Sequence, residues 1–104
     1  MSHVTTHVLD SALGVPAAGV PVQLAGPDGL IASSQTNADG RVTSLGPDLL
    51  PAGTYTLTFF TATYFGETPS FYPRVCIEFS VTGDEHYHVP LLLSPFGYST
   101  YRGS

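Results

Sequence analysis

Alternation of apolar and polar residues along short segments is the feature that most restricts the fold of this chain. In residues 54–59 and 74–81 an apolar side chain stands at every second position. This period of two places successive side chains on opposite faces of a β-strand. Turn sequences separate such segments, namely Pro27-Asp28-Gly29, Asp39-Gly40 and Pro51-Ala52-Gly53. Their spacing is typical of an all-β fold built from two sheets packed as a sandwich.

Helical periodicity is weak along the whole sequence. Residues 60–67, FTATYFGE, are the one place where we expect a short helix. A chain of 104 residues has room for one hydrophobic core. We therefore predict a single domain over residues 1–104, an all-β sandwich with at most one short helix.

Charged residues are scarce for a chain in water. They make up 11% of the sequence, against roughly 25% in an ordinary soluble domain, while 42% is hydrophobic. Large apolar surfaces on soluble proteins usually mark interfaces, so we expect the chain to form oligomers.

Net charge and cysteine content exclude several classes of partner. The formal net charge of −5 repels a phosphate backbone, so nucleic acid is not an expected partner. No apolar stretch of membrane-spanning length and no leader sequence appear, and Cys76 has no cysteine with which to form an intrachain disulfide. We expect a soluble protein of the bacterial cytoplasm with no membrane partner.

Two segments carry histidines on faces that alternation predicts to point away from the core. In residues 3–10, HVTTHVLD, the apolar set faces inward and His7 faces outward. In residues 86–94 the same parity places His88 outward, beside Pro90 and Leu92. Because both outward faces are still partly apolar, we expect an intersubunit cleft lined by His7 and His88.

Four segments stand in one order along nearly the whole chain: HVLDSALGVPAAGVPVQL, NADGRV, HYHVPLLLSPFGYST and YRGS. They resemble the 5-hydroxyisourate hydrolases, the transthyretin-related proteins of purine catabolism. The C-terminal YRGS is the most specific, since transthyretin itself lacks that ending and the corresponding histidines. One departure is Arg74, because the family usually has an acidic residue after FYP.

The resemblance implies a transthyretin-like (prealbumin-like) sandwich that forms a homotetramer with active sites at a subunit interface. It implies hydrolysis of 5-hydroxyisourate to 2-oxo-4-hydroxy-4-carboxy-5-ureidoimidazoline, with no cofactor and no metal. The catalytic residues would be His7, Arg41 and His88, and the substrate-binding residues would be His7, Arg41, Tyr101 and Ser104.

These side chains suit such a reaction. An imidazole with a pKa near 6.5 can take a proton from water at neutral pH, and either His7 or His88 could do so. Arg41 follows a turn, from where its guanidinium could fork onto the carbonyls of an oxidised purine. We expect Tyr101 and Arg102 to close the cleft.

Other interpretations remain open from the sequence. His86 and His88 have the spacing of two metal ligands and His7 could add a third, although metal-free catalysis is the preferred interpretation. Residues 10–60 also resemble non-enzymatic prealbumin-like binding modules, and a carrier of hydrophobic ligands is a third alternative. We treat His3 and His86 as structural or incidental.

Overall fold

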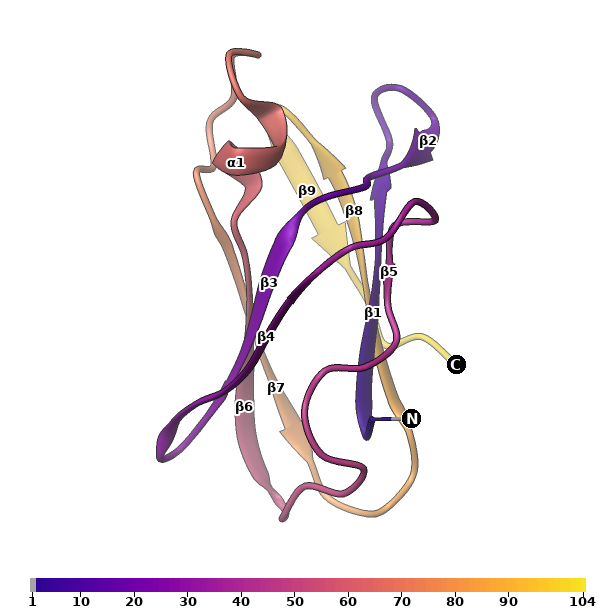
Figure 1. The fold of residues 1–104 in the computed structure, drawn as a ribbon, viewed down its shortest axis with the longest axis vertical. Helices are drawn as coiled ribbons and strands as arrows, with labels where there is room; N and C mark the ends of the chain where they lie inside the picture. The colour runs from indigo at the N-terminus through magenta and orange to yellow at the C-terminus, as the bar shows by residue number, and fades with distance from the viewer. Residues whose placement is uncertain (1) are drawn as a thin grey trace.

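Two β-sheets packed face to face form the computed structural model, which describes residues 2–104 (Figure 1). The first sheet has the order β2-β1-β8-β9, with β5 also paired to β1, and the second has the order β4-β3-β6-β7. The predicted all-β sandwich is confirmed. The strands are β1 (Val4–Asp10), β2 (Val15–Pro16), β3 (Pro21–Gly26), β4 (Gly29–Gln35), β5 (Arg41–Val42), β6 (Gly53–Phe59), β7 (Val75–Val81), β8 (Tyr87–Ser94) and β9 (Gly97–Thr100).

Inward-facing residues at alternate positions of both sheets form the core, as the period of two predicted. In β1 the side chains of Val4, Thr6 and Val8 are buried, and Thr6 donates its hydroxyl hydrogen bond to the Val89 carbonyl at 2.6 Å. This bond satisfies the one polar group of that inward row. In β6 the buried row is Tyr55, Leu57 and Phe59.

The helix α1 (Thr61–Phe65) lies within the segment where a short helix was expected and covers one end of the sandwich (Figure 1). The Tyr64 hydroxyl donates to the Asp10 carboxylate at 2.7 Å, which fixes the helix to the end of β1. Burial, followed by the hydrogen bond and charge of Asp10, raises the pKa of Tyr64 to about 12, so the hydroxyl stays protonated. No helix in residues 2–104 is long and apolar enough to cross a membrane.

A parallel pairing joins β1 to β8, although the two strands lie far apart in the sequence. Its register places Thr5 opposite His88 and His7 opposite Pro90. Parallel neighbours need a long crossover, and here the chain builds the whole second sheet before it returns. The pairing thus brings the two histidine-bearing outward faces side by side.

The turn before β5 fixes the position of Arg41 against β1. The side-chain oxygen of Asn37 accepts hydrogen bonds from the amides of Asp39 at 2.9 Å and Arg41 at 3.0 Å. Gly40 has a φ of 75°, a left-handed conformation that glycine adopts without strain. In the β1–β5 register His7 then lies opposite Arg41.

We predict that Gly40→Ala destabilises the fold by about 2 kcal/mol or more, because the added methyl meets both the left-handed strain and a backbone atom. A Cβ at position 40 would lie 2.4 Å from the Val8 carbonyl oxygen. Gly14 is the matched control, since its φ is 73° and a Cβ there meets nothing within 4 Å. Urea unfolding should show a clearly larger loss for Gly40→Ala, and equal losses would contradict the close approach.

Candidate functional site

A cavity of about 200 Å³ gathers polar side chains from β1, β5, β8 and the C-terminal segment. The C-terminal segment runs along the side of the first sheet that faces away from the second (Figure 1). Three of the residues predicted for the site, Arg41, His88 and Ser104, line this cavity. Its lining residues are Thr5, Thr6, Arg41, Thr43, His86, His88 and Ser104.

His88 is the half-buried histidine of this group. Its Nδ1 lies 2.8 Å from the Thr5 hydroxyl, and its Nε2 has no hydrogen-bond partner among residues 2–104. Partial burial, and next the positive charge of Arg41, lower the pKa of His88 below its ordinary value. The charges of His86 and His7 lower this pKa further, against an opposing effect of the Thr5 backbone. His88 is therefore a neutral imidazole at neutral pH.

His86 also lies in the wall of the cavity, although the sequence interpretation treated it as structural or incidental. Its ring stacks on that of His88 with a centroid separation of 6.4 Å and an interplanar angle of 27°. Its Nε2 lies 3.0 Å from the Thr5 hydroxyl. The signal that could have found it was parity, since residues 86 and 88 must share one face of a strand.

His7 lies beside the cavity rather than in its lining. Its Nε2 is 2.9 Å from the carbonyl oxygen of Asp39. A carbonyl only accepts, so in neutral His7 the proton is on Nε2 and Nδ1 is the acceptor. The β1–β5 register keeps this ring next to Arg41.

Tyr101 and Arg102 line a second cavity of about 240 Å³, which reaches apolar residues of β7 and β8. Arg102 lies over the Tyr87 ring, 4.7 Å from its centroid, and 3.8 Å from the Glu85 carboxylate. Tyr101 is 59% exposed. Within one chain the C-terminal residues are therefore divided, with Ser104 at the first cavity, Tyr101 and Arg102 at the second, and His88 lining both.

His3 uses both ring nitrogens to hold backbone. The Leu50 amide donates to its Nδ1 at 2.8 Å, and its Nε2 lies 2.9 Å from the Glu85 carbonyl. Because that carbonyl only accepts, the Nε2 of His3 carries the proton. The buried ring thus ties the loop at 43–50 to the turn that precedes His86.

Metal ligation was the alternative for the histidines. Among residues 2–104 no three or more His, Cys, Asp or Glu side chains are grouped to hold a metal ion. His86 and His88 instead each direct one ring nitrogen at the Thr5 hydroxyl. The hydrogen-bond partner that His86 and His88 share is thus a protein hydroxyl group.

Comparison with known proteins identifies the family of this chain. The HIUase/Transthyretin family matches residues 4–103 of the chain. The chain belongs to this family. The 5-hydroxyisourate hydrolase of Caulobacter vibrioides is 45% identical over 100% of both chains. The solved structure of Klebsiella pneumoniae 5-hydroxyisourate hydrolase has a TM-score of 0.91 and 42% identity, covering 100% of this chain and 94% of that one.

Transthyretin proper is also similar. Sea bream transthyretin, solved in complex with thyroxine, has a TM-score of 0.88 and 31% identity, covering 96% of this chain and 93% of that one. A protein named as a hydrolase and one solved with bound thyroxine thus share the sandwich, so the fold alone does not decide between catalysis and ligand binding. The distinction depends on the residues of the cavity.

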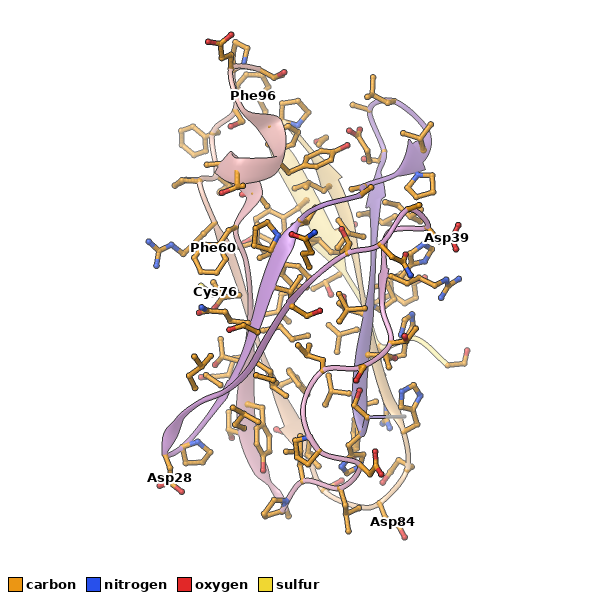
Figure 2. The ribbon with its side chains drawn as sticks, in the orientation of Figure 1. Asp28, Asp39, Phe60, Cys76, Asp84 and Phe96 are labelled. Carbon is orange, nitrogen blue, oxygen red and sulfur yellow. The ribbon has the colours of Figure 1, made fainter. Side chains whose placement is uncertain are left out.

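Arg74, the residue that departs from the hydrolase pattern, is remote from this cavity. Its guanidinium carbon lies 5.7 Å from the centroid of the Phe60 ring, a cation–π contact. Figure 2 shows Phe60 and Cys76 at the side of the molecule opposite to Asp39, the residue whose carbonyl contacts His7. Arg74 and Phe60 adjoin the ends of β7 and β6 in the second sheet, so this departure lies away from the histidine group.

Gly103 allows the C-terminal segment to lie flat against His88. Its amide donates to the His88 carbonyl at 2.8 Å, closing an isolated antiparallel bridge. A Cβ at this position would lie 2.6 Å from Cδ2 of His88 and 3.1 Å from Cγ of Pro90. A side chain would thus displace either the ring or the segment.

We predict that Gly103→Ala moves the C-terminal segment away from His88 while the sandwich stays folded. Gly97→Ala is the control, because a Cβ there meets only the Ser94 hydroxyl at 3.7 Å. In ¹H–¹⁵N NMR spectra, the imidazole and amide signals of His88 should shift in Gly103→Ala and stay in place in Gly97→Ala. Unchanged His88 signals in Gly103→Ala would contradict the close packing.

Proposed function

We propose that this chain hydrolyses 5-hydroxyisourate to 2-oxo-4-hydroxy-4-carboxy-5-ureidoimidazoline in urate degradation. The observation that carries the proposal is the cavity in which neutral His88, Arg41 and Ser104 meet. Support comes also from relatives that match the chain over nearly their full length and are named as 5-hydroxyisourate hydrolases, among them the one from Caulobacter vibrioides.

His88 is the proposed general base. Its Nε2 takes a proton from water as the water oxygen attacks a carbonyl carbon of the six-membered ring. The bond between that carbon and the ring nitrogen then breaks, the carbon becomes a carboxylate, and the nitrogen receives a proton. His7 is less suited to the first step, because it lies beside the cavity rather than in its lining.

Arg41 is proposed to bind the substrate and offset the charge that develops on it. The residue is exposed on a two-residue strand, next to the cavity, and has no ion-pair partner among residues 2–104. A free guanidinium can donate two parallel hydrogen bonds to the carbonyls of an oxidised purine. His7, Tyr101 and Ser104 are proposed as further contacts to the substrate.

The test is hydrolysis of 5-hydroxyisourate freshly made by urate oxidase and followed by its loss of ultraviolet absorbance. We predict that the chain accelerates this loss, that His88→Asn lowers kcat by about 10²- to 10⁴-fold, the contribution of a positioned base, and that a chelator leaves the rate unchanged. Thr56→Val, on the second sheet, is the control variant. A wild-type rate no faster than the spontaneous reaction would refute the proposed activity.

The pH dependence follows from the lowered pKa of His88. The basic form of a group with a lowered pKa persists to lower pH, so activity should remain through neutral pH and be lost on acidification with a midpoint below about 6.5. A rate profile for kcat/KM at constant ionic strength measures that midpoint. A midpoint above the ordinary histidine value would show that another group controls the reaction.

We propose a homotetramer with the active sites at a subunit interface. The low charge supports it, as do the edge positions of β7 and β9 and the exposure of Tyr98 on β9. An interface there would also bring a second chain to the cavity that Tyr101 lines. Light scattering at micromolar concentration should give four times the chain mass, and a monomer would remove the proposed intersubunit site.

We propose a cytoplasmic location, because the chain carries an exposed free thiol. Cys76 is free and exposed on β7. Thiols stay reduced in the cytoplasm and tend to be oxidised outside it. Cell fractionation with detection of the chain tests this placement.

A further inference from the structure

A single hydroxyl group joins two of the imidazoles in the cavity. The Oγ1 of Thr5 lies 2.8 Å from Nδ1 of His88 and 3.0 Å from Nε2 of His86. We propose that Thr5 relays a proton from His88 to His86, and thereby sets which nitrogen of His88 faces the substrate as a base. The proposal rests on the function proposed above and adds two residues to it, Thr5 as a positioning residue and His86 as the final proton acceptor.

The hydroxyl has one proton, so it donates to one imidazole and accepts an N–H from the other. If His86 donates to Thr5, Thr5 donates to Nδ1 of His88, and the proton of neutral His88 is on Nε2. If His88 donates from Nδ1, Thr5 donates to Nε2 of His86, and the lone pair of His88 is on Nε2. Only the second order leaves His88 able to take a proton from water in the cavity.

The proposed relay takes the second order. Nδ1 of His88 is the nitrogen next to Oγ1 of Thr5, and Nε2 has no hydrogen-bond partner among residues 2–104. In this order the proton on Nδ1 is hydrogen-bonded to Thr5, and the lone pair on Nε2 is free to accept a proton from water.

Burial and charge give the relay its direction. His88 is half-buried, whereas His86 is exposed, so the imidazolium is better hydrated at His86. The cationic Arg41 of β5 and the titratable His7 of β1 act on His88 and oppose a positive charge there. The acidic Asp84 and Glu85 directly precede His86 in the chain. A proton therefore moves from the site toward solvent.

Every proton that is given up in the proposed step has a named acceptor. Water gives a proton to Nε2 of His88, Nδ1 of His88 gives its proton to Oγ1 of Thr5, and Oγ1 gives its own proton to Nε2 of His86. His88 and Thr5 end neutral and His86 ends as an imidazolium. The reverse sequence returns the proton to the ring nitrogen that leaves during ring opening.

Thr5→Val tests the relay because valine keeps the shape of this buried residue and removes the hydroxyl. We expect kcat to fall about 10- to 100-fold, part of the roughly 10²- to 10⁴-fold contribution of positioned acid–base groups, with KM nearly unchanged. Thr5→Ser should restore most of the rate, since it restores the hydroxyl. Thr56→Val controls for the loss of a strand threonine elsewhere, and thermal unfolding verifies that each variant is folded.

His86→Gln separates proton transfer from simple positioning. The glutamine amide can still contact the Thr5 hydroxyl, but it cannot take up a proton near neutral pH. The relay predicts that kcat falls as it does in Thr5→Val, and that the double variant is no slower than either single one. Wild-type kcat in His86→Gln, or in Thr5→Val, would overturn the relay.

Imidazole ¹⁵N chemical shifts test the relay without substrate, so a failure of the proposed hydrolysis would not decide this result. In the wild type the proton of neutral His88 should be on Nδ1. In Thr5→Val it should move to Nε2, and in Thr5→Ser it should return to Nδ1. A wild-type His88 that carries its proton on Nε2 would exclude the proposed order of donors and refute the relay.

Discussion

The parallel pairing of β1 with β8 is the constraint on which the site depends. It sets Thr5 opposite His88, and the separate antiparallel pairing of β1 with β5 sets Arg41 opposite His7. Thr5 and His88 are separated by 83 positions, so no local turn could bring them together. Because the inward faces of both strands are buried in the core, a slip of one residue would turn their apolar side chains outward. The hydrophobic core therefore fixes the register that assembles the polar cavity.

Alternation was sufficient to predict the sandwich and the outward direction of His7 and His88. It carried no information on which strands are neighbours, because a period of two is the same in parallel and antiparallel pairs. For that reason the sequence could place histidines on a face but could not show that a threonine lies between two of them. The polar partner of His88 is Thr5, 83 positions away, and such a contact depends on topology alone.

The C-terminal segment shows a similar limit. Its resemblance to the hydrolases marked Tyr101 and Ser104 as a unit, yet in one chain they lie at different cavities. The physical reason is the bridge between Gly103 and His88, which turns the segment across β8 and leaves the side chains before and after it on different surfaces. Gly103 lets the segment approach the imidazole of His88, the proposed base, because a Cβ at position 103 would meet its Cδ2 atom. Only the three-dimensional structure could reveal this contact.

The use of a hydroxyl between the histidines, in place of a carboxylate, fits the charges around them. A carboxylate beside His88 would favour the imidazolium and raise the pKa of the ring, which would oppose the lowering caused by burial and Arg41. It would also offer Arg41 an ion-pair partner and so compete with a substrate for the guanidinium. A neutral hydroxyl orients the ring and can pass a proton without either effect. The cavity thus keeps a neutral imidazole and an unpaired guanidinium side by side, the combination that the proposed water attack on a ring carbonyl would use.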